Sequence, residues 1–101
     1  MSIRVTKVRI YRGRQADPSS GAGMLLALVS VDVGELAIHR LKVVKMPDGR
    51  LIVSMPSILT DEGEWRDVVH PFQRKTRAEL DAAVLGAYQR EIAGQAVQGG
   101  A

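Results

Sequence analysis

The sequence has no cysteine among its 101 residues, and only 4% of them are aromatic. The lack of cysteine excludes disulfide bonds, thiolate nucleophiles and cysteine-ligated zinc. No apolar run approaches the roughly 18 residues that a membrane-spanning helix needs. The first residues, 1–4, include no apolar signal core. We therefore expect a cytoplasmic protein with no membrane partner.

Sequence motifs for catalysis are also lacking. His39 and His70 are the only histidines, and neither occurs in an H-x-x-x-H or H-E-x-x-H spacing. There is no G-x-S-x-G elbow and no glycine-rich phosphate loop, and no specific pair of acid–base groups. We expect no enzyme, no cofactor, no metal and no small-molecule substrate. A divalent ion held by either histidine together with carboxylates would instead indicate an enzyme.

The length suits a single domain, which we expect over residues 1–93 and followed by a disordered tail over 94–101. The net charge is +3 and the pI is about 9.7. No acidic residue interrupts the basic series Arg4, Lys7, Arg9, Arg12 and Arg14. Such a surface suits a polyanion, and the alternative is a solvated face that keeps the protein soluble.

Apolar patterning and turn residues predict several strands and one helix. The strands are expected over 3–12, 24–33, 36–45, 51–55 and 65–69, with a loop over 13–23 and a helix from near Thr76 to near Gly94. The apolar phase changes between Val5 and Val8, which a β-bulge or a fraying strand end would explain. This order favours an α+β fold, an antiparallel β-meander of about five strands followed by one C-terminal amphipathic helix.

The expected helix starts among basic residues. Thr76 and Glu79 match a capping box. The apolar stripe comprises Leu80, Ala83, Val84, Ala87 and Tyr88. Arg74, Lys75 and Arg77 oppose the helix dipole at about 0.3–1 kcal/mol each, a cost that a bound anion would remove. The alternative, equally compatible with the sequence, is that Asp81 neutralises Arg77 while the other two are solvated.

Two features between the last strand and the helix have structural explanations. Trp65, the only tryptophan, could stack on a nucleobase. With so few large rings available, we favour a core or lid position for it. His70-Pro71 is expected to form a corner in which the imidazole bonds a loop carbonyl.

Residues spread over roughly four fifths of the chain resemble the SpoVG family (stage V sporulation protein G, the septation regulator). The resemblance rests on the string M-P-S…T…G-E-x-R-D…H-P…T-R, formed by Met55-Pro56-Ser57, Thr60, Gly63-Glu64, Arg66-Asp67, His70-Pro71 and Thr76-Arg77. Matches before and after it include Val5-Thr6, Val8-Arg9, Ile38-His39, Leu41-Lys42-Val43, Val84 and Tyr88.

The resemblance implies a homodimer formed by sheet-edge pairing, since edges offer unpaired backbone groups. It also implies a bacterial DNA- and RNA-binding regulator with effects on septation and sporulation. By position, the expected phosphate contacts are Arg66, Arg74, Lys75 and Arg77, with Arg9 and Lys42 as weaker candidates.

The chain departs from the family pattern at three places. Ile58 and Leu59 stand where basic residues are usual, the 13–23 loop looks longer, and Arg40 replaces a usual acid. Because an apolar pair in a charged loop can mark a partner site, a second hypothesis is a protein-interaction module with the same dimeric fold that does not bind nucleic acid.

Overall fold

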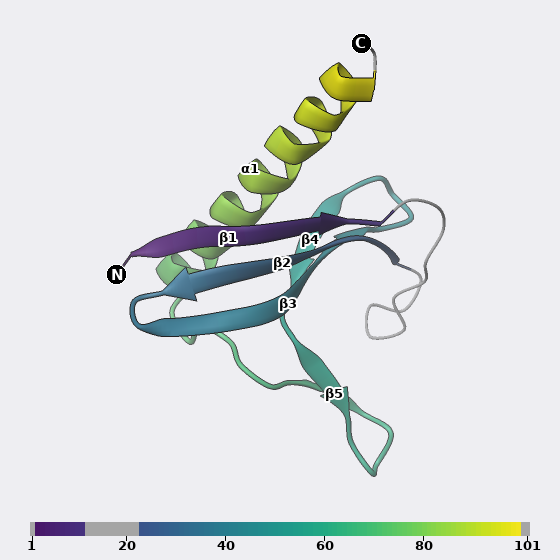
Figure 1. The fold of residues 1–101 in the computed structure, drawn as a ribbon. Coiled ribbons are helices and arrows are strands. Elements are labelled where there is room, and N and C mark those ends of the chain that lie inside the picture. Colours follow the sequence, from purple (N-terminus) through teal and green to yellow (C-terminus); the bar gives the residue numbers. More distant parts are fainter. Residues whose placement is uncertain (1, 12–22, 100–101) are drawn as a thin grey trace.

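The computed structural model describes residues 2–11 and 23–99, with side chains to residue 94. Its elements are β1 (Ile3–Ile10), β2 (Met24–Val33), β3 (Leu36–Lys45), β4 (Leu51–Ser54), β5 (Ser57–Leu59), β6 (Trp65–Asp67) and α1 (Arg74–Gly99). A four-stranded sheet is covered on one face by α1, and the β5–β6 hairpin projects beyond the sheet (Figure 1). Arg12, Arg14 and nearly all of the expected 13–23 loop lie outside the described residues.

The large sheet is an antiparallel meander with strand order β1-β2-β3-β4. The predicted α+β class is confirmed, and β2 and β3 have the predicted bounds. Gly34, at a φ of 59°, forms the tight turn between them. Strand β5 was not predicted, because Pro56 was expected to end β4 without a further strand. Beyond that proline the chain pairs with β6 in a separate two-stranded sheet.

Three irregularities interrupt the register of the meander. One lies between Val5 and Lys7 in β1, which explains the apolar phase change. A second lies between Leu25 and Ala27 in β2. The third is in β3, where two residues, His39 and Arg40, lie opposite Ser30 of β2. Arg40 has a φ of 68°, a left-handed conformation that is strained for a side chain of this kind.

The core lies between α1 and the covered face of the sheet. Its buried members are Ala27, Val29, Val31, Leu41, Val43, Val53, Met55, Leu80 and Val84. The predicted helical stripe is confirmed, since Leu80, Val84 and Ala87 are buried while Ala83 and Tyr88 are half-buried. Each large aliphatic side chain contributes about 1.5–3 kcal/mol when it is fully buried.

The helix begins at Arg74, near the predicted Thr76, whereas the end predicted near Gly94 was wrong. The amide of Arg77 donates to the carbonyl of Gln73 at 3.1 Å, so Gln73 caps the helix and the Thr76–Glu79 capping box does not form. Gln73 takes this position in spite of the weak capping preference of glutamine. At the other end α1 passes Gly94 and stops at Gly99, because alanine and glutamine on both sides of Gly94 favour helix. The domain boundary at 93 and the disorder of 94–101 stay predictions.

Helix α1 is 26 residues long. Within the described part of the chain, no helix combines the length and apolar character needed to cross a membrane.

Candidate nucleic-acid interface

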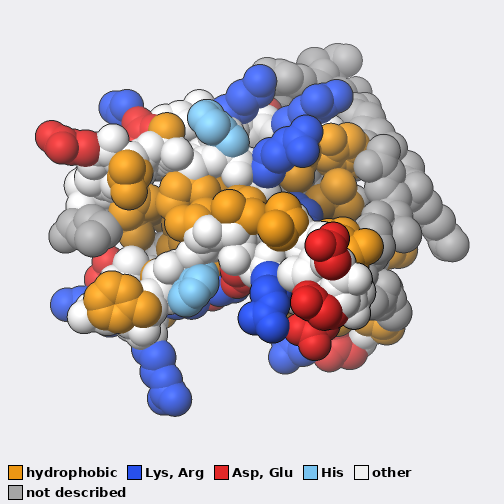
Figure 2. All heavy atoms as spheres, turned by 90° about the horizontal axis from the view of Figure 1, so that it is seen from below, with side chains coloured by type: hydrophobic (Ala, Val, Ile, Leu, Met, Phe, Trp, Pro, Cys, Tyr) orange, Lys and Arg blue, Asp and Glu red, His pale blue; other side chains and the backbone are white. Residues whose placement is uncertain are grey.

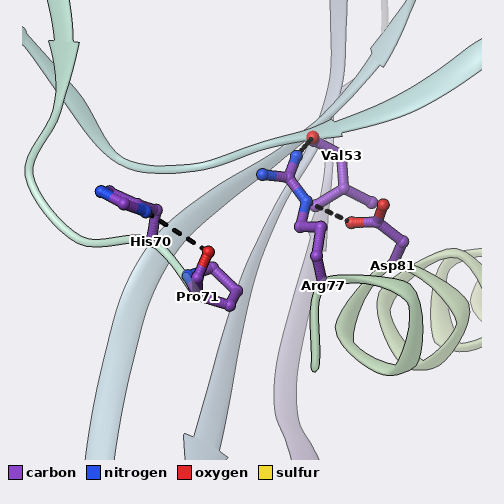
Figure 3. A network of polar contacts seen from close by, with 5 residues as sticks. All are labelled: Val53, His70, Pro71, Arg77 and Asp81. Carbon is purple, nitrogen blue, oxygen red and sulfur yellow. Dashed lines mark hydrogen bonds and ion pairs between the residues drawn. The ribbon is translucent and has the colours of Figure 1, made fainter. Parts of the chain in front are cut away.

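Arg77 is engaged inside the fold. Its Nε donates to Oδ1 of Asp81 at 2.9 Å, and its Nη2 donates to the backbone carbonyl of Val53 at 2.6 Å (Figure 3). The side chains of Arg77 and Asp81 are each 37% exposed, so solvent screens this pair only in part. The pairing with Asp81 is thus the alternative that the structure contains. A phosphate contact by Arg77 stays a prediction, and it would have to share a guanidinium that already has two partners.

Arg74 and Lys75 differ from Arg77 in their surroundings. Both are exposed in the first turn of α1, which contains no acidic residue. Among residues 2–11 and 23–94, neither side chain forms an ion pair. These two cations therefore remain available to an anion at the helix start.

Arg66 lies on the separate hairpin, away from α1 (Figure 1). Its Nη2 is 2.9 Å from Oε2 of Glu64, with both side chains largely exposed. The neighbouring Trp65 is 42% exposed, so the prediction of a core or lid position for it was wrong. The physical reason is that β6 pairs only with β5, leaving the ring no second layer to cover.

Arg9 and Lys42 are brought together by the register of the sheet. Arg9 pairs with Leu28, which pairs with Lys42 on its other side. Cross-strand neighbours share a face, so the two cations stand in one row about 10 Å apart, two strand spacings. Since Leu41 and Val43 point into the core, this row lies on the face turned away from α1.

Tyr11 is a residue of this surface that the sequence reasoning missed. The guanidinium of Arg9 lies 5.3 Å from the centre of its ring, a cation–π distance. Tyr11, Arg40 and Lys42 line a shallow groove of about 320 Å³. The two-residue spacing from Arg9 to Tyr11 could have identified Tyr11 from the sequence, whereas the left-handed backbone of Arg40 has no sequence signal.

The six predicted contacts therefore form three separate groups. They are the helix start (Arg74, Lys75 and Arg77), the hairpin (Arg66) and the open face of the sheet (Arg9 and Lys42). The sequence predicted the first group as a cluster, and it contained no sign that the last two residues lie in one row.

The two histidines make local contacts. Nδ1 of His70 donates to the carbonyl of Pro71 at 3.3 Å, which confirms the expected corner (Figure 3). Nδ1 of His39 lies 2.9 Å from Oγ of Ser30 beside the β3 bulge. Within the described residues, no three acidic or histidine side chains are grouped as a metal ion would need.

The comparisons with known proteins agree with this fold and motif pattern. The SpoVG family model matches residues 3–90. A protein of Heliobacterium modesticaldum named "Putative septation protein SpoVG" is 44% identical over 72 residues, covering 70% of this chain and 80% of its own length. SpoVG 1 of Listeria monocytogenes is 37% identical over 86% of this chain and 79% of its own length.

A SpoVG protein of Clostridium beijerinckii is 31% identical over 96% of this chain and over its whole length. The name shared by these relatives refers to septation and to no chemical reaction. The chain belongs to the SpoVG family.

Proposed function

We propose that this chain is a homodimeric, non-enzymatic regulator located in the bacterial cytoplasm. It binds DNA or RNA mainly through phosphate groups. The names of the relatives suggest septation as the process it regulates, and sporulation is the other process that the family resemblance implies. The observation that supports binding best is the exposed pair Arg74 and Lys75 in a first turn without acids.

The physical argument starts from the helix dipole. The N-terminus carries partial positive charge and backbone amides without intrahelical partners. Two added cations raise the local potential further, which is unfavourable for the free protein and favourable for a phosphate. A phosphate there would contact amides and cationic side chains together, with little dependence on base sequence.

The open face of the sheet supplies a second surface. Arg9 and Lys42 stand there in one row, with Tyr11 next to Arg9. An aromatic ring among cations is typical of surfaces that bind single-stranded nucleic acid. We assign this row a secondary role, because the family resemblance makes Arg9 and Lys42 weaker candidates than the residues at the helix start.

Binding can be measured by fluorescence anisotropy with labelled single- and double-stranded DNA and with RNA. Affinity should fall steeply between about 50 and about 200 mM salt, because neutralised phosphates release counterions. The double variant Arg74→Ala/Lys75→Ala should weaken binding to all sequences and lower the magnitude of the log–log salt slope by about two.

A matched control is Lys45→Ala/Arg90→Ala, which removes one lysine and one arginine from exposed positions elsewhere. It should keep the parental slope. If no nucleic acid binds at low salt, the proposal fails. An equal loss in the control variant would reject the helix start as the contact surface.

Sheet-edge pairing is the proposed basis of the dimer. The two edges of the large sheet are β1 and β4. At β4, the carbonyl of Val53 already accepts a hydrogen bond from Arg77, which leaves β1 as the edge for pairing.

The exposure of Ile58 and Leu59 favours a second candidate function. These residues are 58% and 57% exposed on β5, so the apolar pair remains at the surface of the chain. The alternative is thus a protein-interaction module that does not bind nucleic acid. A pull-down from lysate with and without nuclease separates the two, because nuclease would release only partners held through nucleic acid.

A further inference from the structure

An apolar groove lies where the ends of β1, β2 and β3 meet the segment that leads into α1. Its volume is about 420 Å³, and its apolar lining includes Ile3, Val33, Leu36, Ile38, Val69 and Phe72. Leu36 is 69% exposed and Phe72 is 89% exposed. Figure 2 shows hydrophobic side chains in a band across the face of the molecule seen from the hairpin end. Large exposed apolar side chains beside an apolar groove indicate a surface that another element covers.

The β5–β6 hairpin, residues 57–67, has apolar side chains that no other layer of the chain covers, and we call it the arm. It projects from the body of the molecule (Figure 1), and its residues Ile58, Leu59 and Trp65 are 58%, 57% and 42% exposed. An isolated two-stranded hairpin is marginally stable in water, and strands as short as these need packing against another layer. The arm therefore presents apolar side chains that have no covering layer in a single copy.

The tip of the arm has a defined shape and an acidic character. The amide of Thr60 donates to the carbonyl of Glu64 at 2.8 Å, and the amide of Gly63 donates to the carbonyl of Thr60 at 2.9 Å. Asp61 and Glu62 are exposed within this turn. Gln73 and Thr76 line the groove, and the two cations Arg74 and Lys75 lie between them in the chain, so an acidic tip seated there would approach basic residues.

We propose that the arm of one copy docks in the groove of a second copy, and that the second arm docks reciprocally in the first groove. The apolar side chains of each arm would cover the partner's Leu36 and Phe72, and each acidic tip would approach the partner's Arg74 and Lys75. A reciprocal exchange about a two-fold axis closes the assembly at two copies. The inference rests on the homodimer of the proposed function and is the alternative to sheet-edge pairing as the way the copies join.

A docked acidic tip would leave some N–H donors of Arg74 and Lys75 without a partner. An arginine and a lysine together present several N–H donors, so a partner carboxylate and a phosphate can contact the same pair. Docking of the arm and binding of nucleic acid would therefore share these two cations, and the dimer is measured in the absence of nucleic acid so that the two are told apart.

The test is the mass of the full chain, freed of nucleic acid, in light scattering and sedimentation over a concentration series. The parent should be a dimer. Leu59→Glu in the arm and Phe72→Glu in the groove should each raise the dimer dissociation constant by about tenfold or more, as expected for loss of an apolar contact at the centre of an interface. Both residues are exposed in the single copy, so folding should persist, as circular dichroism can verify.

The matched control is Ile92→Glu, which places the same charge on an exposed apolar position of α1 outside the groove. It should leave the dissociation constant unchanged. A mixture of the Leu59→Glu and Phe72→Glu chains should recover part of the association, because one intact arm meets one intact groove. Glu62→Lys should weaken the dimer, and combining it with Arg74→Glu should restore part of the loss.

Hydrogen exchange separates this arrangement from sheet-edge pairing. Dilution of the dimer should release protection of amides in residues 57–67, whereas edge pairing would release protection in β1. Protection confined to β1, a dimer insensitive to both arm and groove variants, or a mass that grows without limit would overturn the exchange of arms. A monomer at every concentration would overturn the dimer as well, and the nucleic-acid titration would still decide the binding part of the proposed function.

Discussion

Arg77 of α1 donates a 2.6 Å hydrogen bond to the backbone carbonyl of Val53 in β4. The acceptor lies on an edge strand of the sheet. The same guanidinium contacts Asp81 one helical turn further on. One side chain therefore joins the helix to the sheet edge and occupies a carbonyl that another strand could have used.

We expect Arg77→Ala to lower the free energy of unfolding by about 1–2 kcal/mol, the range for a charge-assisted hydrogen bond that is partly exposed. Arg77→Lys should recover only part of this, since one ammonium reproduces the two-directional contact poorly. Urea unfolding followed by circular dichroism measures both changes.

Arg74→Ala serves as the control for that experiment. Arg74 is exposed in the same turn and has no ion pair among the described residues, so its loss should change stability by less than about 0.5 kcal/mol. A loss of stability at Arg74 as large as that at Arg77 would contradict the structural role given to Arg77.

The strained backbone of Arg40 leads to a second prediction. A left-handed conformation costs a non-glycine residue about 1–2 kcal/mol, and glycine would remove this strain. Glycine also has more freedom in the unfolded chain, which destabilises the folded state by about 0.5–1 kcal/mol and offsets part of the gain. Arg40→Gly should therefore stabilise the protein by about 0.5–1 kcal/mol. The measurement is the midpoint of urea or thermal unfolding.

Replacing a glycine that has a positive φ tests the same reasoning from the other direction. Gly49, with a φ of 89°, lies in the turn before β4, and a β-carbon added there would have open space around it out to 4 Å. Gly49→Ala should destabilise through the backbone alone, since no clash arises. If Arg40→Gly destabilised the protein as much as Gly49→Ala does, the arginine side chain would have to make contacts that outweigh the strain of its backbone.

Much of the fold follows from local patterns in the sequence. The ten-residue strands β2 and β3 were predicted because Gly34 marks the turn between two apolar runs, and the phase of β1 indicated a bulge or a fraying end. The start of α1 was predicted near Thr76, slightly late, because threonine suits a cap better than Gln73 does. The arm was missed because its strands of three residues are stabilised by pairing with each other, which a local pattern does not encode.

The candidate site was less accessible to prediction. The spacing of four between Arg77 and Asp81 allowed an ion pair, and the structure contains it. The bond to Val53 joins residues 24 apart in the chain, so only the tertiary fold reveals it. The row of Arg9 and Lys42 likewise depends on strand order and register.

Tyr88 supplies a prediction about alkaline pH. Burial raises the pKa of its hydroxyl above the ordinary 10.0, because the phenolate is poorly solvated in the fold. The unfolded chain then loses this proton at lower pH than the folded chain does. Stability from this group is therefore complete below about pH 10 and declines as pH rises through the raised value.

Tyr88→Phe isolates this contribution. Unfolding free energies at about pH 8 and about pH 10.5 should fall more for the parent than for the variant, which has no proton to lose. The comparison uses the difference between the two proteins, so titration of lysines affects both alike. An identical pH dependence would show that the phenol is solvated in the folded state.

The open face of the sheet gives the last prediction. Arg9→Ala should weaken binding to every nucleic acid tested and lower the salt slope by about one, as loss of one phosphate contact does. Arg4→Ala is the matched control, because Arg4 lies on the same strand but contacts Asp32 at 3.3 Å. Removal of Arg4 should change the slope little, since its charge is already opposed. A fall with Arg4 as large as that with Arg9 would mean that total charge decides the affinity and that the row across the sheet has no particular role.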